Sequence, residues 1–504
     1  MRTKFKTIGF LTLGAAFAAH AQSSQPVLAS EGTSSAPPLS AAEQTINDIK
    51  NPASWLSWGA DLRSRNEYYN NDRSLSDKVA NHEQDYFRFR ARIWTSIKPI
   101  DDLSFNVRLT TEPREYIEPS NSGTWEADHL DSRGKYSWYG HRGWDWSYAI
   151  LDQMNVRYTN AFSLPAAATV GRQDISLGDN WLTGDGTPLD GSTTMFMDAA
   201  RLTYNFKDQD TVVDAIGVMQ YARANAWLPT INEQNRALCD QNEKGAIFNV
   251  NNTTFKFLSW DFFFLYKNDS RYDSDILDQP TGMTGDNANI YTVGGRVYGL
   301  LTDNIRYSAE GAYQFGEKQD LNIVNDDFGK SYDYRTLDAF GVNSSAFYMF
   351  KDSLNDQVGL SYEYLTGDNP NTKNDEMFDI MWGRYPRWTD LYTFTLTPEG
   401  RIAQYGNYHR VGPTWTLKPT KKLDVSTSYF LLLTDQDVPT RASASNQKYF
   451  DGGIVRGQYL QEMLRYKFNS HLSALLQGEL FFPGDYYTEH PLMSFVRAEI
   501  NLTF

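Results

Sequence analysis

Hydrophobic and polar residues alternate one by one over many short segments of the chain. In the segment 495–504, polar side chains fall on one face and apolar side chains on the other, namely Val496, Ala498, Ile500, Leu502 and Phe504. A period of two predicts a β-strand with one apolar and one polar face. The edge of a soluble sandwich requires such a strand, and so does a membrane barrel whose wall separates lipid from a wet lumen.

The same alternation recurs along the whole chain after residue 50. Eighteen segments show it, an even number, as bacterial outer-membrane barrels require. They are 54–70, 85–98, 103–116, 148–160, 167–175, 197–206, 211–221, 246–257, 260–268, 290–301, 304–316, 335–350, 356–366, 401–418, 422–434, 453–468, 471–482 and 491–504.

The connections between these segments alternate between long and short. The short ones include 99–102, 207–210, 302–304, 419–421 and 469–470, and the long ones include 117–147, 176–196, 222–244, 269–289, 317–334, 367–400 and 435–452. Short periplasmic turns and long outer loops produce this rhythm. A β-propeller would repeat in four-stranded units, and no such period is present. The pattern predicts an all-β fold, a transmembrane antiparallel barrel of about 18 strands.

The N-terminal residues have the pattern of a secretory signal. Arg2, Lys4 and Lys6 precede a short apolar run, and Ala19-His20-Ala21 is a small-x-small cleavage site. We therefore expect a signal peptide over 1–21, a disordered periplasmic segment over 22–50 with a short helix at 41–50, and the barrel over 51–504. The predicted location is the bacterial outer membrane.

Composition excludes several other classes of protein. No later segment carries the 18 or so apolar residues of a membrane helix, which argues against an inner-membrane protein. The single cysteine, Cys239, rules out an intrachain disulfide. The net charge of -15 becomes about -18 (44 minus 62) without the three basic signal residues, and this acidity argues against nucleic-acid binding.

One face of the predicted strands is rich in arginine. Arg88, Arg90 and Arg92 alternate with Phe87 and Phe89. Because an arginine at the lipid midplane costs about 2–4 kcal/mol, we predict that the arginine face lines the lumen. The candidate lumen residues are Arg63, Arg65, Arg88, Arg90, Arg92, Arg108, Arg157, Arg172, Arg201, Arg296, Arg306, Glu310, Arg410, Arg465 and Arg497.

These arginines admit two interpretations. A guanidinium matches a carboxylate, and rings of arginine select anions in pores. Alternatively, arginine and glutamate form ladders that stiffen the wall, with partners at Asp61, Glu67, Glu112, Glu310, Glu363, Glu479 and Glu499. For Arg88, Arg90 and Arg92 the neighbouring predicted strands add positive charge, at Arg63, Arg65 and Arg108, and do not balance it. This patch therefore favours the functional interpretation.

Other features carry less chemistry. Aromatic residues near strand ends suit the two membrane interfaces, for example Trp94, Tyr116, Tyr158, Tyr204, Trp415 and Phe482. Acidic loop residues, such as Asp179, Asp185 and Asp190, match no ordered calcium loop, so we expect no cofactor and keep a loop Ca²⁺ site as the alternative. The seven histidines form no Ser/His/Asp grouping, and we expect no enzyme activity.

Several short motifs, in this order and spacing, resemble the alginate export family of outer-membrane barrels. They are 170–173, 178–184, 197–202, 294–296, 309–316, 362–368, 378–388 and 481–485. The resemblance implies an eighteen-stranded barrel with an electropositive constriction that passes an anionic polysaccharide such as alginate.

The resulting hypothesis is an outer-membrane channel for an anionic polysaccharide or oligosaccharide, passed by passive diffusion. The loops 117–147 and 367–400 would fold over the mouth as gates or sieves. A general or sugar-uptake porin is the alternative, and a barrel enzyme or surface adhesin is the rival from another class. The expected partners are outer-membrane lipid, lipopolysaccharide, the anionic saccharide and the barrel-assembly machinery.

Overall fold

The computed structural model describes 41–71, 82–118, 143–146, 149–184, 196–223, 226–231, 239, 241–273, 283–284, 286–319, 334–383, 386–392, 406–437 and 451–504. The expected signal peptide and most of the segment 22–50 lie outside these residues. Helix α1 (Ala41–Lys50) occupies the stretch expected to be helical, so the segment expected as disordered ends in regular structure. Among the described residues, no helix is long and apolar enough to cross a membrane.

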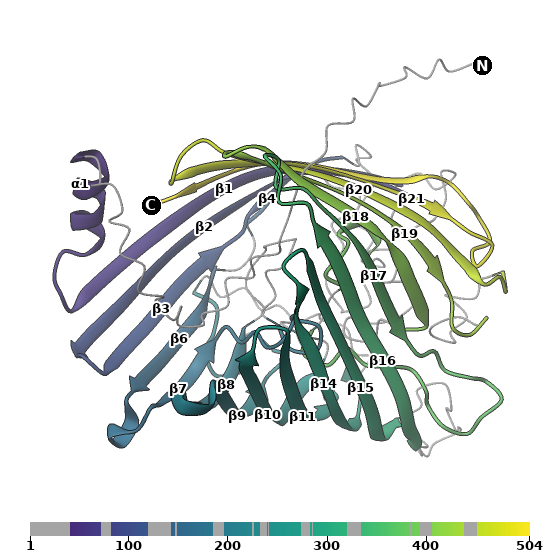
Figure 1. Ribbon diagram of the computed structural model, residues 1–504, viewed down its shortest axis with the longest axis horizontal. Coiled ribbons are helices and arrows are strands. Elements are labelled where there is room, and N and C mark those ends of the chain that lie inside the picture. Colours follow the sequence, from purple (N-terminus) through teal and green to yellow (C-terminus); the bar gives the residue numbers. More distant parts are fainter. Residues whose placement is uncertain are drawn as a thin grey trace.

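The wall is a closed antiparallel barrel of eighteen strands (Figure 1). Each strand pairs with its neighbours, and the last pairs back onto the first, from Asp61↔Thr503 to Asn70↔Ser494. Closure pairs every wall strand on both sides, which satisfies the backbone polar groups inside lipid. The wall strands are β1 (Leu56–Asn70), β2 (Glu83–Ile100), β3 (Leu103–Thr111), β6 (Ala149–Thr159), β7 (Ala166–Gln173), β8 (Met197–Phe206), β9 (Thr211–Gln220), β10 (Asn242–Phe255), β11 (Leu258–Ser270), β14 (Ala288–Thr302), β15 (Ile305–Gln319), β16 (Tyr334–Met349), β17 (Gln357–Leu365), β18 (Tyr408–Thr420), β19 (Leu423–Leu433), β20 (Val455–Lys467), β21 (Leu472–Pro483) and β22 (Met493–Thr503).

Each of the eighteen predicted segments corresponds to one wall strand. The largest difference is at β18, predicted from 401 and observed from Tyr408, and residues 401–405 lie outside the described ranges. Two short strands extend the main sheet beside the wall: β4 (Arg114–Glu118) pairs with β2, and β5 (Gly143–Asp145) pairs with β4. The other small elements belong to the connections, namely β12 (Tyr272–Asp273), β13 (Met283–Thr284), η1 (Ala161–Ser163) and η2 (Lys207–Gln209).

The two ends of the barrel differ. Figure 1 shows α1, the C-terminus and the start of β1 at one end. The short turns lie at this end, including Asp101–Asp102 between β2 and β3. Asp210 has a φ of 46° in another of these turns, a left-handed conformation that aspartate tolerates. In bacterial outer-membrane barrels the short turns face the periplasm, and for this reason we call the short-turn end the periplasmic end.

The outward faces of the strands are apolar, as the alternation predicts. Leu62 is 59 % exposed and Ile500 is 56 % exposed on the outside, whereas the next residue along β1, Arg63, is 4 % exposed on the inside. This exposed apolar surface is the area that lipid covers. Among the described wall strands, Glu462 of β20 is an outward exception, and it accepts a hydrogen bond from the Thr427 hydroxyl of the adjacent strand.

Two of the six aromatic residues predicted for the outer interfaces face the lumen instead. Trp94 lies on the face of Arg92 and covers Gly59, where an added Cβ would come within 2.6 Å of the indole. Tyr116 is 6 % exposed and packs on the inward-facing Tyr86. The prediction was wrong because closeness to a strand end says nothing about which face a residue occupies.

Candidate functional site: the barrel lumen

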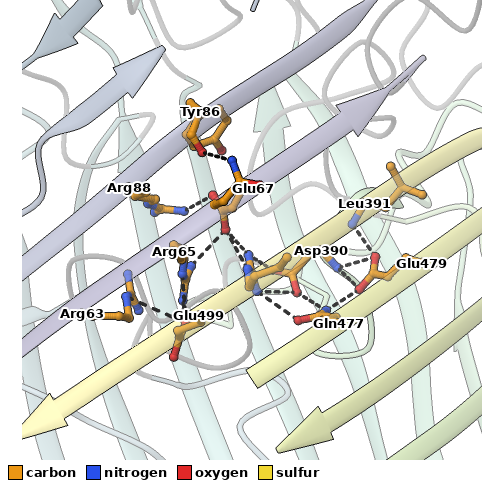
Figure 2. Close-up of polar contacts among 12 residues, drawn as sticks. Arg63, Arg65, Glu67, Tyr86, Arg88, Asp390, Leu391, Gln477, Glu479 and Glu499 are labelled. Atoms are coloured by element: carbon orange, nitrogen blue, oxygen red, sulfur yellow. Dashed lines mark hydrogen bonds and ion pairs between the residues drawn. The ribbon is translucent and has the colours of Figure 1, made fainter. Parts of the chain in front are cut away.

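Arginines of β1 and β2 meet carboxylates on the lumen wall. Arg88 places Nη1 3.2 Å from Glu67 Oε2 and Nε 2.6 Å from Glu112 Oε1. Arg65 reaches Glu67 at 3.1 Å and Glu499 at 2.6 Å. Figure 2 shows both Arg65 and Arg88 directed at the Glu67 carboxylate. Each carboxylate in this group serves more than one guanidinium.

The remaining arginines of the predicted patch are also paired. Arg63 lies 2.9 Å from Glu112. Arg90 and Arg92 share Asp61, at 3.2 and 2.5 Å. The expectation that the neighbouring strands only add positive charge was therefore wrong. The strand register explains the difference, since it sets Asp61 of β1 directly opposite Arg92 of β2.

Most of the other candidate arginines have carboxylate partners on the same inner face. Arg108 lies 2.7 Å from Asp152 and 2.9 Å from Asp174. The other pairs are Arg201 with Asp214, Arg296 with Asp261 and Asp179, Arg410 with Glu363, and Arg497 with Glu67 and Asp390. The candidate Glu310 is buried opposite Arg296 in the strand register, and Arg465 faces Asp424.

Arg157 and Arg306 differ from the other lumen arginines. Within the described part of the chain, neither has a carboxylate at ion-pair distance. Arg157 is exposed, and its cross-strand neighbours are Ser104 and Thr169. Arg306 donates from Nε to Gln357 Oε1 at 3.3 Å and stacks on Phe347. Both residues lie near the periplasmic ends of their strands, β6 and β15.

Arg172 does not line the lumen. It shares a face of β7 with Val170, which is 59 % exposed on the outside, and pairs across the register with the outward-facing Met154. Its guanidinium is nevertheless buried, because Asp198 binds Nε at 2.9 Å and Phe196 covers it at 3.8 Å. The argument from the cost of lipid exposure failed here because neighbouring side chains shield the charge.

Two stretches of chain fold into the lumen between the walls. We call residues 174–184, after β7, the first inner segment. The described residues 374–383 and 386–392, after β17, form the second inner segment. A β-bridge between Thr183 and Trp382 joins the two. The loop 367–400, expected over the mouth, therefore lies inside the barrel over much of its described part. Most of the loop 117–147 lies outside the described residues.

Apolar side chains hold both inner segments against β10 to β17. Phe378 and Trp382 are 0 % exposed and belong to one buried cluster with wall residues of these strands. Trp181 stacks on Phe378 with ring centroids 5.5 Å apart and donates to Glu363 at 3.1 Å. Trp382 donates to Glu243 at 3.1 Å. Burial and hydrogen bonding together fix the segments on this wall.

The second inner segment then crosses to the arginine-rich wall. Asp390 lies 3.1 Å from Arg497 of β22. Glu479 of β21 accepts the backbone N–H groups of Leu391 and Asp390, at 2.7 and 3.2 Å. Figure 2 shows Asp390 and Leu391 beside Glu479 and Gln477, with the Glu67 group next to them. The segment thus ties two opposite walls together through the lumen.

The sequence pattern did not predict that these inner residues are buried, although 178–184 and 378–388 are among the motifs that resemble the family. The available signal was the run Phe378-Asp379-Ile380-Met381-Trp382. An exposed loop rarely carries so many large apolar side chains in sequence. Such a run inside a long predicted loop indicates that the loop is buried.

The acidic loops offer no evident metal site in the ranges the structure describes. No group of three or more potential ligands is present there. Asp379 lies 3.5 Å from Lys267, and Asp368 pairs with Arg335 at 2.7 Å. Asp185 and Asp190 lie outside the described residues, so the loop Ca²⁺ alternative stays a prediction.

Asp435 holds the start of the loop 367–400, to which the second inner segment belongs. Burial alone would raise the pKa of Asp435, but hydrogen bonds from His409, the Gly367 N–H, Gln436 and the Tyr364 hydroxyl lower that pKa to about 2. The Gly367 N–H lies 2.9 Å from the carboxylate, at the point where the chain leaves β17. This carboxylate is therefore ionised at neutral pH.

A closed barrel with an apolar outside, a polar wall inside and inward-folded segments defines a channel protein of the outer-membrane porin class. The family model "Alginate export" matches residues 54–498, and the chain belongs to this family of the bacterial outer membrane. The comparison with curated protein sequences gives no match.

Several solved structures share the fold. OccAB4 of Acinetobacter baumannii is 10% identical over 90% of this chain and 98% of its own, with a TM-score of 0.52. OccK8 (OprE) of Pseudomonas aeruginosa is 11% identical over 89% and 98%, with a TM-score of 0.51. OccAB1 of A. baumannii is 11% identical over 89% and 96%, with a TM-score of 0.50. At these identities the likeness concerns the fold alone.

Proposed function

We propose that this channel passes an anionic polysaccharide or oligosaccharide of the alginate type by passive diffusion. The observation that carries the proposal is the distribution of arginine over the inner wall. Ten wall strands carry one of the candidate arginines on their inner face, namely β1, β2, β3, β6, β8, β14, β15, β18, β20 and β22. A planar, permanently charged guanidinium is the side chain best matched to a uronate carboxylate.

The mechanism requires no chemical step on the solute. Carboxylates of the polymer would exchange between guanidinium groups that hold them strongly enough for entry and weakly enough for exit. The inner segments narrow the path, so the solute passes as an extended chain. On this proposal the protein is a transporter and not an enzyme.

Planar-bilayer recording on the full-length protein tests the proposal. We expect a reversal potential in a salt gradient that reports anion preference, and we expect a short oligouronate to block the current. A neutral glucan of equal length is the control and should block more weakly. A cation preference, or equal block by both saccharides, would contradict the proposal.

A general or sugar-uptake porin is the second candidate. The observation that favours it is the extensive pairing of wall arginines with carboxylates, which lowers the net charge offered to a solute. Such a porin would show little ion preference and similar block by charged and neutral saccharides. A barrel enzyme or adhesin would instead show no saccharide-dependent block of a conducting path.

A further inference from the structure

We infer that Arg157 and Arg306 are the specificity-determining groups of the channel and form an anion-selecting collar at its periplasmic mouth. This inference rests on the proposed function and moves its decisive residues away from the Arg88, Arg90 and Arg92 patch. The two collar arginines lie on β6 and β15, with six wall strands between them on one side and ten on the other. They therefore face the lumen from well-separated parts of the wall.

The central arginines are buried and already bound to carboxylates. Arg88 is 4 % exposed and already binds Glu67 and Glu112. Arg65 is 2 % exposed and binds Glu67 and Glu499. A uronate that approached these guanidiniums would have to displace a buried carboxylate, which would be left without its partner in a poorly solvated site. The central network is therefore a poor receptor for a passing anion.

Arg157 is exposed on the lumen side of β6. Its side chain faces the lumen, since Asn155 two residues before is buried on the inside and Tyr158 points outward. The residues beside it on the adjacent strands, Ser104 and Thr169, are neutral and small. The charged groups that act electrostatically on Arg157 are Arg201 and Asp214, which pair with each other at 2.8 Å. Since no carboxylate of the described residues is at ion-pair distance, the exposed guanidinium keeps its N–H donors available to a solute.

Arg306 is held by one aromatic ring and one hydrogen bond. Phe347 supports the guanidinium from below at 4.1 Å, and Gln357 accepts only the Nε donor. The terminal amino groups of Arg306 are left for a ligand, because no carboxylate of the described residues lies within ion-pair distance of it. Asp179 of the first inner segment also acts electrostatically on Arg306, but its carboxylate pairs with Arg296 and accepts a hydrogen bond from the Ser308 hydroxyl. Stacking and one hydrogen bond orient the planar group.

The position of the collar adds a direction to the proposal. Arg157 is two residues from the end of β6, and Arg306 is the second residue of β15, both at the short-turn end. A polymer that enters from the periplasm meets these charges at the short-turn end, where Asp179 of the first inner segment lies on Ser308, close to Arg306. The arrangement suits capture on the periplasmic side, as export would require.

The test uses the full-length protein in planar bilayers, with R157S/R306S compared with wild type. Removing one positive charge about 10 Å from the solute path in water lowers the local anion concentration roughly two-fold. The ratio of anion to cation permeability should therefore fall at least about two-fold. The change should shrink at 1 M salt, where the screening length is about 3 Å. Oligouronate added from the short-turn side should block the variant more weakly than wild type.

Matched variants separate charge from fit. R157K/R306K keeps both charges and should retain ion selectivity while losing part of the oligouronate block, because lysine lacks the planar fork. N205S changes a neutral lumen-facing residue at the same end of β8 and should leave both readouts unchanged. R88S/R90S/R92S should lower thermal stability and leave selectivity nearly unchanged.

Each result of these recordings bears either on the anion preference of the channel or on the role of the two collar arginines. A wild-type channel without anion preference would overturn the proposed function. A selective wild-type channel whose preference and sided block survive in R157S/R306S would overturn the collar alone. Loss of selectivity in a folded R88S/R90S/R92S variant, with none in R157S/R306S, would return the role to the central patch.

Discussion

The two sides of the lumen are held in different ways. On the side of β1, β2 and β22, buried guanidiniums share a few carboxylates, with Glu67 bound by three arginines. On the side of β10 to β17, large apolar side chains of the inner segments pack against the wall. On the charged side, removing one partner leaves the other buried charges uncompensated. On the apolar side, removing one large side chain loses its packing and leaves a cavity.

The largest effect is expected on the apolar side at Trp382. Trp382→Ala removes a fully buried indole and its hydrogen bond to Glu243, and should lower the free energy of unfolding by about 3–5 kcal/mol. Thermal unfolding in detergent measures the loss, and single-channel conductance should rise if the segment detaches. Trp55→Ala, at a residue 52 % exposed, is the control and should change neither value. Equal losses of stability in Trp382→Ala and Trp55→Ala would contradict the role of Trp382 in holding the second inner segment.

On the charged side, Glu67→Gln tests the dependence on one carboxylate. The neutral amide leaves Arg65, Arg88 and Arg497 short of one negative charge inside the wall, and we expect a loss of about 3 kcal/mol. Chemical denaturation of the refolded barrel gives the value. Glu317→Gln, an exposed carboxylate on β15, should cost less than about 0.5 kcal/mol. A wild-type stability for the Glu67 variant would show that the network is dispensable.

The smallest effect concerns the loop carboxylate Asp435, whose pKa is lowered to about 2. A lowered pKa contributes stability that is complete above the ordinary value near 3.8 and is lost as the pH falls through about 2. Since the group is half-buried, we expect no more than about 1 kcal/mol. The melting temperatures of wild type and Asp435→Asn should differ at pH 6 and converge near pH 2. The exposed Asp437→Asn is the control, and a difference independent of pH would contradict the assignment.

The barrel wall could be predicted from the sequence because its physics is local. Lipid on one face and water on the other impose a period of two, and eighteen such segments gave eighteen strands. The alternation predicts less well which face of a strand a charged residue occupies where neighbouring side chains shield its charge. Arg172 lies on the outward face because Asp198 and Phe196 shield it, and no period reveals that shield.

The interior could not be predicted because it depends on contacts between distant parts of the chain. The partner of Trp382 is Glu243, and the partner of Asp390 is Arg497. Neither pair leaves a local pattern. A wall ladder is one of the two interpretations of the arginines that the sequence admits, but only the strand register shows that Asp61 lies opposite Arg92 and Glu499 opposite Arg65.

The contact between Arg497 and its two acidic partners bears on how the barrel is assembled. Glu67 belongs to the first strand, and Asp390 belongs to the second inner segment. All three meet at the seam where β22 joins β1, and Arg497 is 0 % exposed there. A chain whose seam closes before the inner segment has docked traps a cation with half of its counter-charge missing. The seam can therefore act as a checkpoint in biogenesis, at which closing and filling the barrel become one cooperative event.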